Sequence, residues 1–235
     1  MFEREPITAG ELMDKQFLPK PVIVEGMLPA GTYILAGTPK IGKSFLMTQL
    51  CWSVAEGIPF LGLATRKSTV LYLALEDTQE RLQSRLARMF GTDWASSEFH
   101  LLFQINQQGD ALIQRFQDFI LEHPDTRLIV IDTLQRVRES DGSSYSYSHD
   151  YETIMPLKTF ADAYDVALIV VHHTRKNEDD DNLFNQISGT NGLLGAAALF
   201  FCIRAKMMCF WSRQAGMCQT SDMCCVLIRV DAFGI

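Results

Sequence analysis

Short apolar runs alternate along most of the chain with stretches of helical spacing. In the helical stretches, such as 43–56 and 110–123, apolar residues recur three and four positions apart. The apolar runs have the length of strands and lie at 31–36, 68–75, 99–105, 127–131 and 166–171. Strands that are apolar on both sides are expected in a parallel sheet whose two faces are covered by helices. The pattern therefore predicts an α/β fold with a mostly parallel central sheet and helices on both faces.

The two ends of the chain depart from this alternation. Residues 1–21 are mostly polar, and we expect a lead-in segment there with one short helix at 8–15, capped by Thr8. Residues 22–198 carry the alternating pattern, beginning with a strand and a turn at 22–31, and form the predicted core. Residues 199–235 have little periodicity and are interpreted as an atypical tail.

Composition narrows the class of protein. With 235 residues, of which 47% are hydrophobic, the chain suits one compact core with a short extension. A net charge of −7 argues against a surface coated for nucleic acid, although contacts confined to a few loops remain compatible with it. Because no apolar run reaches about 18 residues and no signal segment is present, we expect a cytoplasmic protein without membrane association. The six cysteines lack the spacing of a zinc site or a disulfide framework.

The segment Ile34 to Ser44, ILAGTPKIGKS, carries the pattern G-x-x-x-x-G-K-S between a predicted strand and a predicted helix. In this context the pattern predicts a phosphate-binding loop that wraps a triphosphate in backbone N–H groups. Lys43 is expected to reach the β and γ phosphates of the triphosphate, and the Ser44 hydroxyl to bind Mg²⁺. The expected nucleotide contacts are Gly37, Thr38, Pro39, Lys40, Ile41, Gly42, Lys43, Ser44 and Phe45.

Acidic residues follow two of the predicted strands, at the sheet edge where open α/β folds bind ligands. Glu76 and Asp77 follow the run at 68–75. We interpret Glu76 as the base that orients and deprotonates the attacking water, and Asp77 as a helix-start residue. The alternative is that both only begin the helix. Asp132 closes the run at 127–131 and is expected to hold Mg²⁺ together with Ser44.

The last predicted core strand ends in two histidines, His172 and His173. As the first polar residue, His172 is placed to sense the γ-phosphate. A shared zinc site is not favoured, because adjacent residues of an extended chain point to opposite sides. The polar stretch 139–150 is interpreted as a solvated loop, with stacking of Tyr145, Tyr147 and His149 on a polymer as the alternative.

Four motifs now stand in order at successive strand ends: GTPKIGKS, LALED, LIVIDTLQ and VVHHTR. As a set they resemble the RecA-like P-loop ATPase core, and in particular the RepA-type hexameric helicases of plasmids and phages. The segment ISGTNGLLGAA is similar to the one that follows the pore-facing loop in that family. The resemblance implies a homo-hexameric ring, ATP sites between subunits, an arginine finger given in trans and single-stranded DNA in the channel.

The resemblance ends near Ala197, where the family continues into strands and a basic finger. If the codons for Lys206 to Cys209 are read two bases later, they encode Asn or Asp, then Asp and Val, which is closer to the family ending. Our hypothesis is that the reading frame slipped near Ala197 or Ala198, and the alternative is a divergent tail. An early stop in the alternative frame of the encoding DNA would contradict the hypothesis. Under this hypothesis Arg204 is not assigned as the arginine finger.

Three functions follow from these features. The leading interpretation is Mg²⁺-dependent ATP hydrolysis coupled to DNA translocation or unwinding in a ring-shaped replicative helicase. The second is an ATP-dependent recombination, repair or regulatory module that binds DNA without unwinding it. The third, which follows from the tail, is an ATP-binding remnant that does not assemble.

Overall fold

The fold was analysed in a computed structural model, which describes residues 6–92, 96–105, 110–138, 147–173, 199–204, 207–212 and 226–229. Side chains are described within these ranges up to residue 173, apart from those of 147–151. The expectations for the loop at 139–150, including stacking by its tyrosines and histidine, and for the glycine-containing segment at 187–197 lie outside this description.

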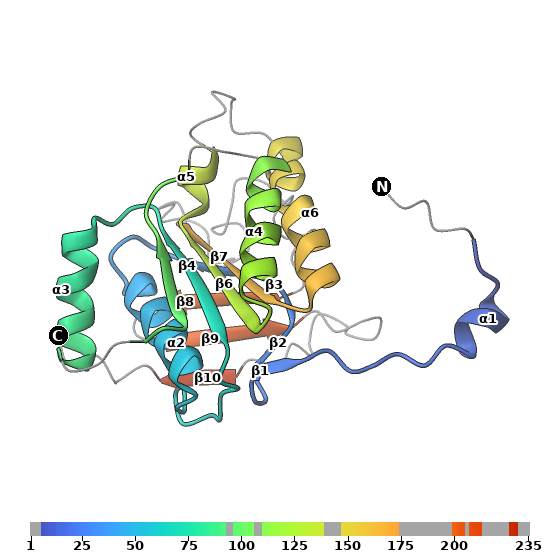
Figure 1. Cartoon of the computed structure of the whole chain (residues 1–235), viewed down its shortest axis with the longest axis horizontal. Helices are drawn as coiled ribbons and strands as arrows, with labels where there is room; N and C mark the ends of the chain where they lie inside the picture. Colours follow the sequence, from blue (N-terminus) through green and yellow to red (C-terminus); the bar gives the residue numbers. More distant parts are fainter. Residues whose placement is uncertain are drawn as a thin grey trace.

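An eight-stranded sheet forms the centre of the molecule (Figure 1). Its strand order is β10-β9-β8-β3-β7-β6-β4-β5. The six neighbouring strands β8, β3, β7, β6, β4 and β5 pair in parallel. β9 pairs antiparallel with both β8 and β10. The strands are β3 (Gly31–Gly37), β4 (Thr69–Ala74), β5 (Phe99–Leu102), β6 (Thr126–Asp132), β7 (Ala167–His173), β8 (Leu199–Arg204), β9 (Met207–Ser212) and β10 (Val226–Arg229). The mostly parallel α/β sheet expected from the apolar runs is thereby confirmed.

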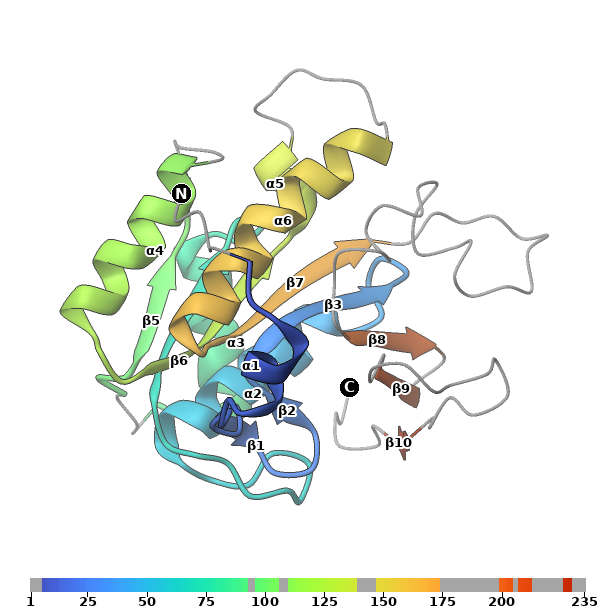
Figure 2. The ribbon, with the colours of Figure 1, turned by 90° about the vertical axis from the view of Figure 1, so that its right-hand side faces the viewer.

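Helices cover both faces of this sheet, as predicted (Figures 1 and 2). On one face, α2 (Lys43–Glu56) packs against β4 and β6, followed along the chain by α3 (Gln79–Phe90). On the other face lie α4 (Asp110–Glu122), the short α5 (Leu134–Arg138), which was not predicted, and α6 (Tyr147–Tyr164). Among the described helices, none is long and apolar enough to cross a membrane.

Alternate residues of each central strand feed two separate cores. In β6, Leu128 and Val130 pack on the α2 side, whereas Ile129 and Ile131 pack on the side of α4 and α6. In β7, Ile169 and Val171 face α2 and their neighbours face α6. This alternation explains the unbroken apolar runs, since neither side of a central strand meets water.

The N-terminal segment lies apart from the body of the molecule (Figure 1). Its helix α1 (Ala9–Met13) has no buried residue and is capped by Thr8, which forms a capping box with Glu11. An ion pair of 2.6 Å between Lys20 Nζ and Asp162 joins the end of this segment to α6. The core then begins with a hairpin of β1 (Val22–Val24) and β2 (Leu28–Pro29), in place of a single predicted strand.

The predicted tail contributes strands to the sheet. β8 pairs in parallel with β3, and β9 and β10 extend the same edge. Strand pairing uses backbone groups, so it does not depend on which side chains a reading frame supplies. The boundary at 198 and the reading-frame hypothesis therefore stay predictions.

Candidate active site

The parallel strands bring the predicted functional residues to one edge of the sheet. Gly37, Asp132 and His173 are the last residues of β3, β6 and β7, and Glu76 follows β4 by two positions. Because these four strands are parallel neighbours, their carboxyl ends meet at the same edge. The helix α2 begins there, directly after the phosphate loop.

The phosphate loop ends at Gly42, which has a φ of 98° and precedes the first residue of α2. A residue with a β-carbon is strained in this conformation, which accounts for the glycine. No side chain caps α2, so the first-turn N–H groups are not satisfied in that way. An uncapped helix N-terminus at the end of a glycine-containing loop fits a phosphate group.

Lys43 is buried at the start of α2, and its ammonium group is hydrogen-bonded to the phosphate loop itself. Its Nζ donates hydrogen bonds to the carbonyl oxygens of Gly37 at 2.7 Å and Thr38 at 2.8 Å. It also lies 2.9 Å from Nδ1 of His173. The ammonium group is thus held within the turn that the sequence predicts to enclose a triphosphate.

The two predicted metal ligands are brought together. The Ser44 hydroxyl hydrogen-bonds to the carboxylate of Asp132, which is 4% exposed. Burial raises the pKa of Asp132, while hydrogen bonds from Tyr72 and Ser44 act in the opposite direction and favour the ionised form. A hydroxyl and a carboxylate are hard oxygen ligands, so this pair fits Mg²⁺.

Glu76 lies beside this pair with one side open to solvent, since 40% of its side chain is exposed. Its Oε1 accepts a hydrogen bond of 2.7 Å from the hydroxyl of Thr133, the residue after Asp132. Its Oε2 is 3.4 Å from Nε2 of His173. The carboxylate is therefore oriented by Thr133, which follows β6, and by His173 at the end of β7, and it is still accessible to a water molecule.

His173, which the sequence interpretation did not select, is the histidine that contacts both Lys43 and Glu76. Since an ammonium group can only donate, Nδ1 accepts from Lys43 and Nε2 carries the proton that faces Glu76. Strand alternation places His173 on the α2 side with Val171, and His172 on the opposite side with Val170. The sensor role of His172 stays a prediction, to which the structure adds His173 as a residue of the site.

Asp77 lies directly before α3 and forms ion pairs with two arginines of that helix. The N-cap of α3 is Thr78, and Asp77 forms ion pairs with Arg85 at 2.6 Å and Arg81 at 3.5 Å. The Arg85 guanidinium also lies 4.8 Å from the ring centroid of Phe45, the residue after Ser44. Asp77 and Arg85 therefore connect the segment that carries Glu76 to the first turn of α2.

Replacing Arg85 by methionine should destabilise the protein by about 3 kcal/mol, because it leaves the nearly buried carboxylate of Asp77 with only the longer pair to the exposed Arg81. Arg81→Met is the matched control: the Arg81 side chain is 67% exposed, and we expect a loss below about 1 kcal/mol. Urea denaturation of both variants measures the difference. Equal losses would contradict the role of the Asp77–Arg85 pair.

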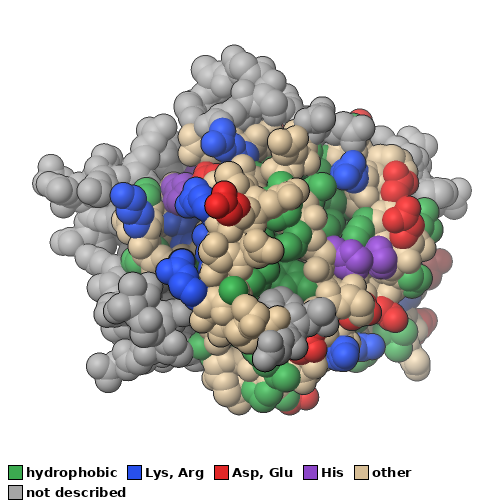
Figure 3. Space-filling view, turned by 60° about the vertical axis from the view of Figure 1, so that its left-hand side comes forward, with side chains coloured by type: hydrophobic (Ala, Val, Ile, Leu, Met, Phe, Trp, Pro, Cys, Tyr) green, Lys and Arg blue, Asp and Glu red, His purple; other side chains and the backbone are tan. Residues whose placement is uncertain are grey.

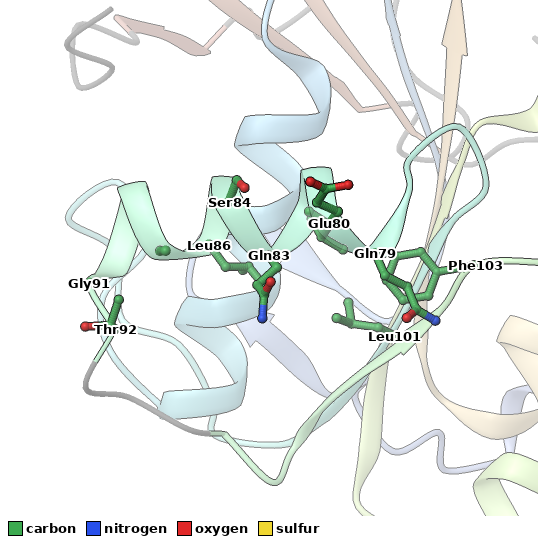
Figure 4. A pocket seen from close by; sticks show the side chains of 11 residues that line it. Gln79, Glu80, Gln83, Ser84, Leu86, Gly91, Thr92, Leu101 and Phe103 are labelled. Carbon is green, nitrogen blue, oxygen red and sulfur yellow. The ribbon is translucent and has the colours of Figure 1, made fainter.

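A groove of about 910 Å³ lies elsewhere, between α3 and the segment that begins at β5. Gln83 and Leu86 lie on the side of α3 that faces Leu101 and Phe103, whereas Ser84 points away (Figure 4). None of the residues that line it belongs to the predicted site.

The fold and the site together define a RecA-like P-loop ATPase domain. A glycine-containing loop between a buried strand and a helix, with a buried lysine and a serine–aspartate pair, is the arrangement of this class. A family model described as "AAA domain" matches residues 2–179, and the chain belongs to this family.

Several known proteins are similar to this chain. The DNA repair protein RadA of Streptococcus pneumoniae is 28% identical over 158 residues, which cover 66% of this chain and 33% of RadA. RadA of Helicobacter pylori (strain J99) is 26% identical over 157 residues, or 66% of this chain and 31% of that protein. The chain thus matches about a third of the length of these relatives.

Two solved structures share the fold. One is an ATPase domain with a TM-score of 0.60 at 13% identity, covering 84% of this chain and 80% of that domain. The other is a DnaB-like replicative helicase, described with its interactions with primase, with a TM-score of 0.65 at 12% identity. That match covers 97% of this chain and 65% of the helicase. These likenesses confirm the RecA-like fold.

Proposed function

We propose that the chain hydrolyses ATP with Mg²⁺ and couples this reaction to translocation along DNA or its unwinding. The observation that supports the proposal most directly is the convergence of Lys43, the Ser44–Asp132 pair and Glu76 at one sheet edge. These groups supply a cation for the phosphates, ligands for a metal and a base for water. Phosphoryl transfer needs all three.

Each residue has a defined part in this proposal. Lys43 would exchange its carbonyl contacts for phosphate oxygens, to which its hydrogen bonds are stronger because the acceptor is charged. Ser44 and Asp132 would hold Mg²⁺, which neutralises charge on the phosphates. Glu76 would take the proton of the attacking water, with Thr133 and His173 fixing the direction of its carboxylate. His172 is proposed to respond to the γ-phosphate from the end of β7.

The assignment to DNA and to a ring of six copies is supported by the motif resemblance and by the class of the structural neighbours. Despite the net charge of −7, more of the lysine and arginine side chains in Figure 3 lie on the left of the face and more of the acidic side chains on the right, with some of each kind on both sides. Such a separation suits contact with a polyanion over a limited area. We propose single-stranded DNA as the polymer and a homo-hexamer as the assembly.

The similarity to RadA favours a second candidate, a repair or recombination module that assembles on DNA without unwinding it. ATPase assays with and without single-stranded DNA, run beside a strand-displacement assay, separate the two. DNA-stimulated hydrolysis with displacement supports the helicase. Stimulation without displacement supports the repair module. An ATPase rate that is the same with and without DNA contradicts both candidates.

The atypical composition of residues 199–235 is the reason for a third candidate, an ATP-binding remnant that does not assemble. Light scattering after size-exclusion chromatography, with and without a non-hydrolysable ATP analogue, tests it. A hexameric mass with the analogue supports the ring. A monomeric mass in both conditions, together with nucleotide binding, supports the remnant.

A further inference from the structure

Tyr72 is a buried polar residue that lies within the apolar run at 68–75, where a side chain is expected to serve only in packing. It lies in the middle of β4, next to β6, and its side chain is fully buried. Its hydroxyl donates a hydrogen bond of 2.6 Å to Oδ2 of Asp132. A buried phenol and a buried carboxylate, on neighbouring strands, thus meet directly beneath the phosphate loop.

This hydrogen bond limits how the carboxylate of Asp132 can turn. Tyr72 holds Oδ2 from the β4 side, and the Ser44 hydroxyl also hydrogen-bonds to the same carboxylate. Both partners of the Tyr72 bond are almost inaccessible to water, so a rotated carboxylate would leave a buried polar atom unpaired. The orientation of Asp132 is therefore set by a residue that has no direct part in binding nucleotide.

We propose that Tyr72 is a positioning residue for the metal site, which turns the free lone pairs of Asp132 toward Ser44 and Mg²⁺. This inference rests on the proposed function, because it assumes that Asp132 and Ser44 hold the ion. Partners that hydrogen-bond to a metal ligand typically change metal affinity by about 10- to 100-fold when removed. Tyr72 belongs to that group of residues.

The chain offers a matched control in Tyr33. Its side chain is also buried, it lies on the same sheet in β3, and its hydroxyl donates to the carbonyl oxygen of Pro29. Tyr33→Phe therefore removes a buried hydroxyl of the same kind at the opposite end of the sheet from the phosphate loop. A purely structural role for Tyr72 predicts that the two variants behave alike.

The experiment measures how strongly Mg²⁺ and ADP promote each other's binding in the full chain. Calorimetric titration with ADP, in excess Mg²⁺ and then in EDTA, gives two dissociation constants whose ratio is the metal coupling. In Tyr72→Phe we expect this ratio to fall by about 10-fold, with the EDTA value unchanged within about twofold. In Tyr33→Phe the ratio should equal that of the wild type.

Thermal unfolding of both variants shows any general loss of stability, and the titrations are made well below each midpoint. A ratio for Tyr72→Phe that matches that of Tyr33→Phe overturns the positioning role while the proposed function stands. If the wild-type chain binds ADP equally with and without Mg²⁺, the proposed metal site itself is overturned, and this inference with it.

Discussion

Lys43→Ala is expected to reduce ATP turnover by about 1,000-fold, since it removes a charged contact to the transferred phosphate that is worth roughly 4 kcal/mol. Lys43 is buried, and its Nζ is positioned within hydrogen-bonding distance of two loop carbonyls and His173. The other lysine of the loop, Lys40, is exposed and precedes α2, so it does not occupy the buried position of Lys43. Phosphate release in steady state measures the effect.

The matched control for this prediction is Lys67→Ala. Lys67 is exposed and lies just before β4, at the amino ends of the parallel strands and away from the phosphate loop. It should keep turnover within about twofold of the wild type, as expected for a surface substitution. Circular dichroism verifies that both variants are folded. Turnover by Lys43→Ala above a tenth of the wild-type rate would contradict the placement of the triphosphate in this loop.

Glu76→Gln is expected to lower turnover by about 100- to 10,000-fold, the range that general base catalysis contributes. The amide keeps the shape of the side chain and an oxygen that can accept from Thr133, but it cannot take a proton from water. Nucleotide affinity should stay within about threefold of the wild type, because this group acts on water and not on the bound phosphates. Single-turnover hydrolysis and equilibrium binding of a fluorescent ATP analogue separate the two effects.

Glu80→Gln provides the comparison, because Glu80 is an exposed acid one helical turn along the chain in α3. Its hydrolysis rate should equal that of the wild type. Hydrolysis by Glu76→Gln at the wild-type rate would show that another group activates the water, with Asp77 excluded by its ion pairs to Arg81 and Arg85.

The sequence was sufficient to predict the fold class and most of the elements that carry the site. α2 was predicted with the bounds that it has, and β3, β4 and β7 within about two residues. These elements are marked by unbroken apolar runs or by a full helical period. The hairpin of β1 and β2 and the short α5 were missed, because two or three residues in a strand and five in a helix leave no period to detect.

Within the site, Lys43, Ser44, Glu76 and Asp132 could be predicted because each is the polar residue at the end of a strand or the start of a helix. His173 could not be distinguished from His172, since the choice depends on which side of β7 faces α2. That side is set by tertiary packing. Tyr72 was concealed for a different reason: a tyrosine within an apolar run is read as core, and only the register with β6 brings its hydroxyl to Asp132.

The alternation of the central strands has a consequence for which substitutions the molecule tolerates. The half of the core beneath α4 and α6 is built mainly from packing residues such as Leu71, Ile129 and Leu168, so volume-conserving exchanges of these residues should cost less than about 1.5 kcal/mol. The half beneath α2 also carries Tyr72, and β6 and β7 end on that side in Asp132 and His173. Below the level of His172, substitutions on the side of α4 and α6 are therefore constrained by shape, whereas those on the side of α2 are constrained by shape and chemistry together.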